Sequence, residues 1–316
     1  MGINKEIASR KKIPKKNKYS SDDIQLYTLC IIPMVLVFIF NYLPMAGIIL
    51  AFKDYKYDKG ILGSNWVGLY NFKFFFESNE FLKLTRNTLL LNGLFIIAGI
   101  AAALLIAILL FCLRGRKNIR IYQTLMITPH FISWVVVSYM VYAFLSPQHG
   151  IVNNILENFG MEKVDWYNTP MAWPIILTVS GVWKNVGMDC IIYYAALMNI
   201  DSTLFEAADV DGANTVEKIK NIIIPALKPL LTVLTILKIG GILRSDFGMF
   251  YQLTRDVGAL YDITDVIDTY TYRVMSVIGN LGMGTAIGLL QSGVGMILVF
   301  SAHYISKKID SELGLF

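Results

Sequence analysis

Charge is what this chain has little of, because only 16% of its 316 residues are Asp, Glu, Lys or Arg while 55% are hydrophobic. Soluble globular domains carry about 25% charged residues, so the composition excludes an ordinary soluble domain. Cysteine and histidine are also scarce, at three residues each. The cysteines lie in apolar stretches without CxxC spacing or nearby histidines, which predicts neither a disulfide framework nor a metal site.

Catalytic and nucleotide-binding motifs are absent as well. The sequence contains no HExxH and no GxSxG motif, so we expect no catalytic residues and no enzyme activity on this chain. It also lacks the GxxxxGK[ST] loop that cradles nucleotide phosphates. We therefore expect no cofactor on this chain.

The sequence does contain long apolar runs. Crossing a hydrocarbon core of roughly 30 Å takes about 20 helical residues, and these runs are continuous rather than alternating, which disfavours a β-barrel. They predict an all-α integral membrane protein with six transmembrane helices in one domain, residues 26–316, behind a basic tail at 1–25. The six runs are Leu26–Phe52, Leu89–Leu113, Thr124–Ser146, Ala172–Met198, Leu227–Leu243 and Gly282–Ile305.

The distribution of Lys and Arg between the runs predicts the orientation. Cations gather in the tail, in the loop from Arg114 to Arg120, between Lys218 and Lys228, and at Lys307 and Lys308. The positive-inside rule then places both termini in the cytoplasm of a cell-membrane protein. Beside a membrane helix, the basic tail fits an anchor to anionic lipid better than a nucleic-acid site.

The connection between the fourth and fifth runs, about 201–225, has the pattern of two short helices. Asp201 or Ser202 can cap a first helix, and Gly212 can adopt the positive φ that ends it. Pro225 then fits the first turn of the fifth spanning helix. A short exposed helix with two alanines beside Glu206 suits docking into a groove on another protein.

This segment resembles the EAA signature of binding-protein-dependent ABC importer permeases. The resemblance is carried by Glu206-Ala207-Ala208, Asp211-Gly212-Ala213 and Ile222 with Pro225, although Ile224 replaces the usual Leu before the proline. Val67-Gly68-Leu69-Tyr70-Asn71-Phe72 and Trp183-Lys184 with Gly187 are similar to elements of the carbohydrate branch. The resemblance runs from about Tyr27 to the C terminus.

The resemblance implies a type I ABC importer permease fold and a set of partners. These are a second, homologous permease subunit, two cytoplasmic ABC ATPase subunits that bind ATP and Mg, and an extracellular binding protein that delivers a sugar or oligosaccharide. ATP hydrolysis is then expected on the separate ATPase chain. The residues implied in coupling to that ATPase are Glu206, Ala207, Ala208, Asp211, Gly212, Ala213 and Pro225.

Polar and ionisable residues inside apolar runs usually mark an aqueous cavity or an ion pair. Asn185 and Asp189 are four residues apart and share a helix face. One hypothesis is a translocation cavity, where a tyrosine can stack on sugar rings. The alternatives are an ion pair between the fourth and fifth helices, or snorkelling to the headgroups. The cavity candidates are Trp183, Lys184, Asn185, Asp189, Tyr193, Lys238, Arg244 and Asp246.

A stand-alone ion-coupled carrier is the alternative function, since it too can have six helices and buried charges. Such a carrier would not need an EAA-type cytoplasmic helix. A membrane enzyme is disfavoured because His130, His149 and His303 are scattered and no carboxylate cluster shares one face. His130, which follows Pro129 in an apolar run, is interpreted as a packed residue.

Overall fold

The computed structural model describes residues 21–309 apart from 79 and 114. Most of the basic tail, Arg114 of the basic loop and the C-terminal end therefore lie outside the described residues. The chain divides into two compact units, Met1–Ile49 and Leu50–Phe316, and each is described by itself.

The first unit consists of the first predicted span. Helix α1 (Ser21–Val37) continues through a π turn, η1 (Phe38–Tyr42), into the 3-10 helix η2 (Leu43–Phe52). Together they form an apolar helical run over Gln25–Phe52, long enough to cross a membrane.

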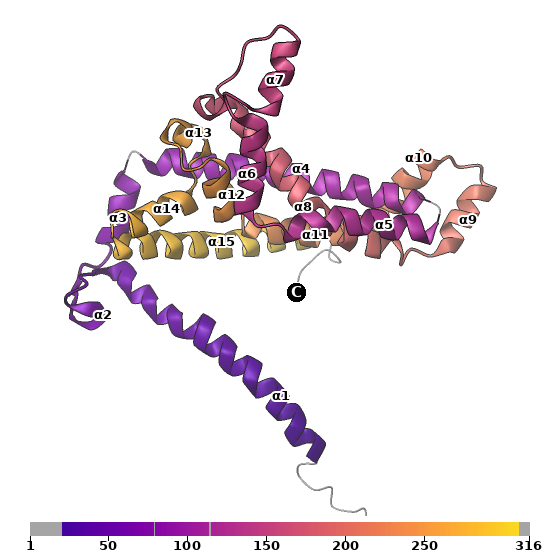
Figure 1. Ribbon diagram of the computed structural model, residues 1–316. Helices are drawn as coiled ribbons and strands as arrows, with labels where there is room; N and C mark the ends of the chain where they lie inside the picture. Colours follow the sequence, from indigo (N-terminus) through magenta and orange to yellow (C-terminus); the bar gives the residue numbers. More distant parts are fainter. Residues whose placement is uncertain (1–20, 79, 114, 310–316) are drawn as a thin grey trace, which may run out of the picture. The chain divides into compact units, whose positions relative to one another are not determined.

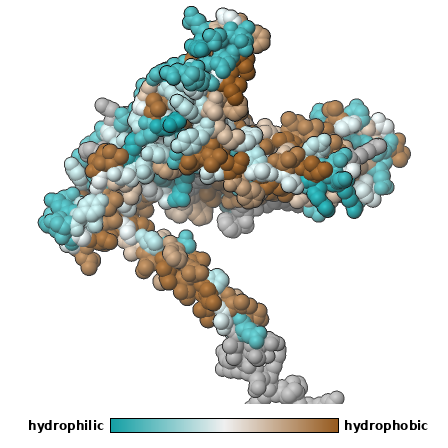
Figure 2. Space-filling model, viewed as in Figure 1, coloured by the Kyte–Doolittle hydropathy of each residue, from teal (hydrophilic) through white to brown (hydrophobic). Residues whose placement is uncertain are grey.

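Four long helices build the second unit. Helix α4 packs along α8, and α11 packs along α15 (Figure 1). Many apolar side chains on their outer faces are exposed, as suits contact with lipid. Figure 2 shows hydrophobic side chains along the bundle and hydrophilic ones at α7 and around α9 and α10. The four are α4 (Glu80–Cys112), α8 (Trp173–Leu197), α11 (Ile224–Gly240) and α15 (Leu281–Ile309).

The third apolar run differs from the single helix that its hydropathy predicts. It forms α5 (Arg116–Ile127) and the short η3 (Thr128–Phe131), followed by α6 (Trp134–Leu145), with a bend of 97° between the two parts. Pro129 lies in the first turn of η3, and the Ser133 hydroxyl accepts a hydrogen bond from Val136 N to cap α6. A proline followed by an N-cap ends one helix and starts another inside a continuous apolar run.

The fifth spanning helix also starts earlier than its apolar run predicts. Helix α10 (Thr215–Lys218) is capped by Asn214 and continues through a π turn, η6 (Ile219–Ile223), into α11. Pro225 lies in the first turn of α11, as expected. The helical run nevertheless continues back through the π turn to Thr215, so the whole run over Thr215–Gly240 starts before the proline. The π turn lies just before the proline, which has no N–H to donate.

Short elements connect the long helices. Figure 1 shows α9 (Ser202–Val210) and α10 at one end of the second unit, with α3 and α14 at the opposite end. The two short strands pair antiparallel. The remaining elements are β1 (Lys53–Asp54), α2 (Gly60–Gly63), β2 (Asn65–Trp66), α3 (Tyr70–Glu77), α7 (Ile151–Asn158), η4 (Trp166–Asn168), η5 (Pro170–Ala172), α12 (Phe247–Leu253), η7 (Gly258–Leu260), α13 (Tyr261–Thr264) and α14 (Ile267–Ser276).

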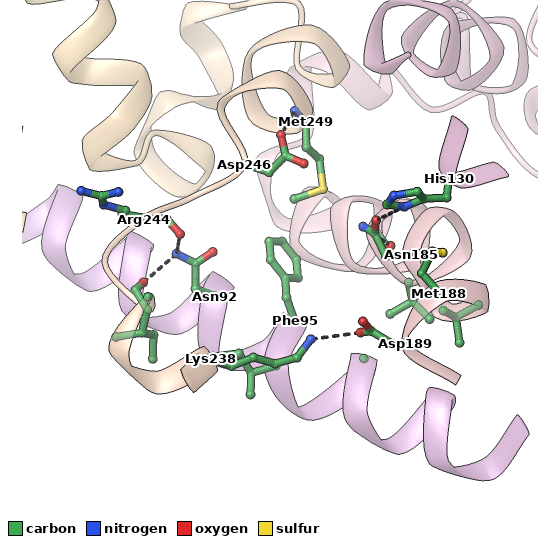
Figure 3. A pocket seen from close by; sticks show the side chains of 17 residues that line it. Asn92, Phe95, His130, Asn185, Met188, Asp189, Lys238, Arg244, Asp246 and Met249 are labelled. Atoms are coloured by element: carbon green, nitrogen blue, oxygen red, sulfur yellow. Dashed lines mark hydrogen bonds and ion pairs between the residues drawn. The ribbon is translucent and has the colours of Figure 1, made fainter. Parts of the chain in front are cut away.

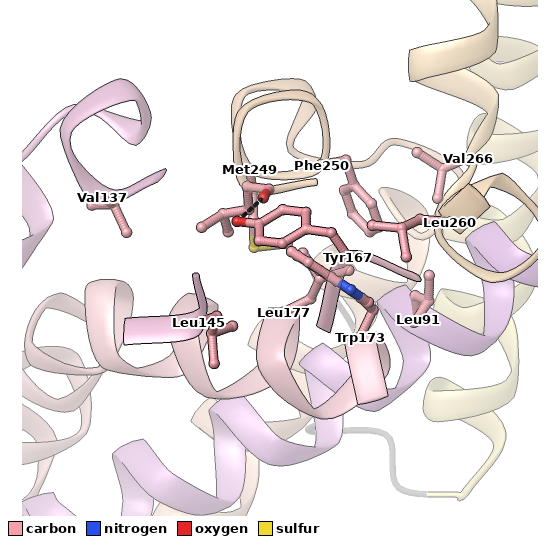
Figure 4. Close-up of a cluster of buried hydrophobic side chains, with 11 residues drawn as sticks. Leu91, Val137, Leu145, Tyr167, Trp173, Leu177, Met249, Phe250, Leu260 and Val266 are labelled. Carbon is pink, nitrogen blue, oxygen red and sulfur yellow. Dashed lines mark hydrogen bonds between the residues drawn. The ribbon is translucent and has the colours of Figure 1, made fainter. Parts of the chain in front are cut away.

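A buried hydrophobic cluster holds α8 against α12 (Figure 4). Trp173 and Phe250 are almost completely buried in it, and Trp173 Nε1 donates to the Trp166 carbonyl at 2.8 Å. Tyr167 lies between them, and burial raises the pKa of its hydroxyl to about 12. Met249 belongs both to this cluster and to the pocket described next, so the cluster fixes one wall of that pocket.

Candidate functional site

A pocket of about 420 Å³ lies among α4, η3, α8, α11 and the start of α12. Figure 3 shows Phe95 and Met249 reaching into it from opposite sides, with polar groups around them. Asn185 and Asp189, which the sequence predicts on one helix face, both line it. The lining residues are Asn92, Phe95, Ile96, Gly99, His130, Gly181, Val182, Asn185, Val186, Met188, Asp189, Lys238, Gly241, Ile242, Arg244, Asp246 and Met249.

An ion pair crosses this pocket from α11 to α8. Lys238 Nζ lies 3.0 Å from Asp189 Oδ2, and the two side chains are 35% and 29% exposed. The sequence left open whether these charges line a translocation cavity or pair between helices. The structure shows the pair and places both residues in the lining of this pocket. Pairing lowers the cost of two charges within apolar helices.

Arg244 and Asp246 lie on the opposite side of the pocket and do not pair with each other. Arg244 Nη2 donates to the Ser292 hydroxyl at 2.8 Å. The Asp246 carboxylate accepts from Trp134 Nε1 at 2.7 Å and from Met249 N at 3.1 Å, which caps α12. The dipole at the N terminus of α12 and these two donors stabilise the Asp246 carboxylate. The described hydrogen bond of the Arg244 guanidinium is to a neutral partner, the Ser292 hydroxyl.

Asp268 of α14 lies within the electrostatic reach of Arg244. Its carboxylate accepts from Ser245 N at 2.7 Å and from Gln291 Nε2 at 3.3 Å. Burial raises the pKa of Asp268, and these two hydrogen bonds and the Arg244 charge act against that rise.

His130 and Asn92 are pocket residues that sequence reasoning missed. His130 Nδ1 lies 3.1 Å from Asn185 Oδ1. Since Asn185 Nδ2 donates to the Gly181 carbonyl, its oxygen is the acceptor for His130. Asn92 Nδ2 donates to the Ile242 carbonyl at 2.7 Å and to the Ser245 hydroxyl at 3.0 Å. Each of these residues stands alone in an apolar run, so only tertiary packing brings it to the pocket.

Three cavity candidates from the sequence do not line this pocket. Trp183 lies on an exposed face of α8, and Tyr193 is buried in a second hydrophobic cluster between α4, α8 and α11. Lys184 is buried and bonds to backbone carbonyls of η3 and its flank. Helical periodicity explains this for positions 183 and 184, which face away from the side shared by Asn185 and Asp189. Tyr193 follows Asp189 by four residues on the same side of α8, but it lies further along the helix, where side chains of α4 and α11 pack against it.

The connection from α9 to α10 forms the second candidate site. Asp201 is the N-cap of α9, since its carboxylate accepts from Thr203 N at 2.9 Å, and this bonding lowers the pKa of Asp201. Gly212 has φ +74° and ends the helix. The helix, glycine turn and second helix are therefore arranged as the sequence predicts.

Side chains on α9 divide into a packed face and an exposed one. Phe205 packs against Phe111 of α4, with ring centroids 5.6 Å apart. Glu206 and Ala207 are exposed beside it, as are Asp211, Gly212 and Pro225, whereas Ala208 and Ala213 are half-buried. The lysine of α10, Lys218, pairs with Asp209 across the turn. The EAA-like residues thus form an accessible patch at one end of the bundle.

Among the residues that the structure describes, no group of three His, Cys, Asp or Glu side chains is placed to hold a metal ion. Cys30, Cys112 and Cys190 are free thiols.

Comparison with known proteins identifies the family. Residues 99–311 match the family described as "Binding-protein-dependent transport system inner membrane component". The chain belongs to this family. It is 36% identical to protein LplB of Bacillus subtilis (strain 168), over 93% of this chain and 92% of that protein.

Two further similar proteins carry descriptions that refer to polysaccharides. The chain is 34% identical to the polygalacturonan/rhamnogalacturonan transport system permease protein YteP of Bacillus subtilis (strain 168), over 91% of this chain and 89% of that protein. A crystal structure of a bacterial ABC transporter involved in import of the acidic polysaccharide alginate contains a similar chain. That chain matches with a TM-score of 0.82 and 33% identity, covering 92% of this chain and 97% of that one.

These findings confirm the resemblance to ABC importer permeases of the carbohydrate branch. They also confirm the all-α membrane fold, and the part of the chain that the structure describes has five helices able to span a membrane, or six if the bent pair counts as one span.

Proposed function

We propose that this chain is the membrane-spanning permease subunit of an ATP-driven importer. It moves an oligosaccharide, delivered by an extracellular binding protein, through the membrane by alternating access. The observation that carries the proposal is the polar pocket enclosed by α4, η3, α8 and α11, in a fold that matches the alginate importer chain over most of its length. A related structure pairs that transporter with a periplasmic protein bound to alginate pentasaccharide.

The partners follow from the proposed role. Two ATPase subunits bind ATP and Mg and dock on α9, and a second, homologous permease subunit completes the translocation path. This chain then carries no cofactor and catalyses no reaction. Docking is supported by the exposed Glu206 and Ala207, because small side chains allow a partner to approach the helix closely.

A single helix connects the docking patch to the pocket. The run Thr215–Gly240 has 26 residues, which corresponds to about 39 Å at 1.5 Å per residue. It begins at the α9–α10 turn and carries Lys238 near its other end. Movement of α9 by the ATPases would therefore shift α11 against α8 at the Lys238–Asp189 pair, which is a rigid-body route between two states.

The substrate we propose is an acidic oligosaccharide. Arg244 is a pocket residue whose guanidinium bonds to the neutral Ser292 hydroxyl, and its remaining N–H donors are the ones that we assign to a sugar carboxylate. Lys238 and Phe95 also line the pocket, and Phe95 offers an aromatic face for a sugar ring. The names of YteP and the alginate transporter support the same class.

In this proposal the protein lies in the cell membrane with both termini in the cytoplasm. The α9–α10 connection then faces the cytoplasmic ATPases. The basic tail at 1–25 would contact anionic lipid headgroups.

Co-purification tests the assembly. The tagged chain is extracted gently from native membranes, and the proteins that remain bound are identified by mass spectrometry. We expect a second permease in about the same amount as the tagged chain, and ABC ATPase subunits in about twice that amount. Recovery of the chain alone, from membranes that retain uptake, would contradict the proposal.

The substrate class has its own test in Arg244→Gln. Uptake of oligogalacturonate is compared with uptake of its neutral methyl ester at equal chain length. Loss of one charge-assisted hydrogen bond costs about 1.5–3 kcal/mol, so we expect KM for the acid to rise by about tenfold or more. An equal effect on the ester would count against carboxylate recognition.

A further inference from the structure

Lys184 is a buried lysine whose role the pocket does not explain. It lies in the middle of α8 with 7% of its surface exposed. None of the ion pairs between described residues includes it. Its side chain instead crosses to the break between η3 and α6, where the third apolar run bends by 97°.

The ammonium bonds to three backbone carbonyls at that break. Lys184 Nζ donates to the His130 carbonyl at 2.7 Å, to the Pro129 carbonyl at 3.3 Å and to the Ile132 carbonyl. A lysine ammonium has three N–H donors, so donors and acceptors match in number. Nζ also lies 5.3 Å from the centroid of the Trp134 ring, within range of a cation–π interaction.

The break needs such a group. A helix end leaves carbonyl oxygens without intrahelical partners, and its dipole favours a cation there. Non-helical backbone at membrane depth persists only where protein or a water-filled cavity satisfies it. Lys184 supplies both the charge and the donors from the neighbouring helix.

Residues at the break either line the pocket or bond to a residue that lines it. His130, whose carbonyl receives Lys184, turns its ring towards Asn185 in the pocket wall. Two residues after Ile132, Trp134 Nε1 donates to Asp246. We propose that Lys184 is a positioning residue that fastens the break to α8 and so sets His130 in the wall of the translocation pocket and Trp134 against the pocket residue Asp246. This inference rests on the proposed function.

The helix before the break, α5, also packs closely against α8. A Cβ at Gly187, one turn from Lys184 on α8, would lie 2.0 Å from the Met126 carbonyl oxygen. The backbones of α8 and α5 are therefore in direct contact there. Lys184 adds a second contact between α8 and this chain segment, at the carbonyls of the break. The Gly187–Met126 contact and the Lys184 hydrogen bonds together fix the orientation of η3 relative to α8.

The test uses the assembled transporter in proteoliposomes and oligogalacturonate as the substrate. Lys184→Met keeps an unbranched side chain of similar length but removes the charge and the donors. Lys228→Met, at an exposed lysine of α11, is the matched control. We expect K184M to raise KM by about tenfold or more with a smaller change in Vmax, since binding groups move out of place. A KM equal to that of K228M would overturn the inference.

A second readout does not depend on transport. His130→Cys is placed in a background where Cys30, Cys112 and Cys190 are replaced by serine, and its rate of labelling by a water-soluble thiol reagent is measured. We expect the rate to change with K184M and not with K228M, and equal rates would overturn the inference. If K184M does not assemble, K184Q, which keeps two N–H donors, is measured in its place. Absence of uptake by the wild-type transporter would instead refute the proposed function.

Discussion

Lys238 Nζ and Asp189 Oδ2 lie 3.0 Å apart and join α11 to α8 across the pocket. Each residue belongs to a helix long and apolar enough to span a membrane. An unpaired charge there is costly, and the pair relieves that cost for both residues. The two helices that meet at this pair are also connected by the α9–α10 segment, so the pair joins the two helices that lead from the proposed docking patch to the pocket.

Breaking this pair should destabilise the protein, and exchanging its charges should restore it. Asp189→Asn leaves the ammonium unpaired, and we expect a loss of roughly 2 kcal/mol, below the value for a fully buried pair because both side chains are partly exposed. The double variant D189K/K238D should recover most of that loss. Thermal unfolding of the detergent-solubilised complex compares the stability of the wild type, D189N and the double variant.

Lys163→Gln, which breaks the exposed pair with Glu157, is the control and should change stability by less than about 0.5 kcal/mol. A double variant no more stable than D189N would contradict the pairing.

Gly212 should be required for transport rather than for folding. It has φ +74°, and a Cβ there would meet nothing within 4 Å, so Gly212→Ala costs only the strain of the left-handed conformation, about 1 kcal/mol. Gly160 has the same φ of +74° and equally open surroundings, and it lies after α7, outside the α9–α10 connection. We expect G212A to lose uptake while G160A retains it, at similar stability. Equal uptake by the two variants would show that the geometry of the turn does not matter for coupling.

Gly187 should tolerate no larger residue. Its added Cβ would lie 2.0 Å from Met126 O and 2.3 Å from Met126 C, which are backbone atoms that cannot rotate away. We expect Gly187→Ala to cost about 3 kcal/mol or to prevent assembly, as overpacking does. Gly93→Ala is the control, since its Cβ would meet nothing within 4 Å. Complex yield and melting temperature distinguish the two, and a G187A complex as stable as G93A would refute the close approach.

Tyr167 should make the folded protein less stable at alkaline pH. Its pKa is raised to about 12 by burial, from an ordinary value of 10.0. A raised folded-state pKa means that stability is full below about pH 10 and is lost as pH rises to about 12, by about 2 kcal/mol. Tyr167→Phe should remove this loss and cost little at neutral pH, because the hydroxyl lies 3.5 Å from its acceptor, the Leu253 carbonyl. Unfolding measured from pH 9 to 12 checks this, and identical pH profiles for the two proteins would contradict it.

Much of the fold follows from the sequence, because membrane helices satisfy their own backbone and need only a long apolar run. The break at Pro129 did not follow, since the run stays apolar on both sides of it. Pro129 and the Ser133 cap mark the break locally, but the donor that bonds to its free carbonyls is Lys184, which lies on another helix and is 52 to 55 residues away in the sequence. A tertiary contact of this kind leaves no local pattern.

The candidate site was predictable where it depends on local geometry. Asn185 and Asp189 share a face by helical spacing, and Gly212 and Asp201 mark the turn and cap of α9. His130 lines the pocket in a segment next to the bend in the third apolar run, and this bend was not predicted. The sequence alone suggested that His130 is a packed residue. Lys184 was a cavity candidate because it is charged, but its position on α8 turns it towards backbone carbonyls instead.

The central claim is that ATP drives this permease, and it is tested most directly by uptake of radiolabelled oligogalacturonate into proteoliposomes containing the complex purified with this chain. ATP is supplied on the side of the ATPases, and ion gradients are collapsed with ionophores. The account predicts uptake that requires both ATP and a binding protein and that persists without any gradient. Uptake that follows an ion gradient and ignores ATP would contradict the account and would indicate a stand-alone carrier.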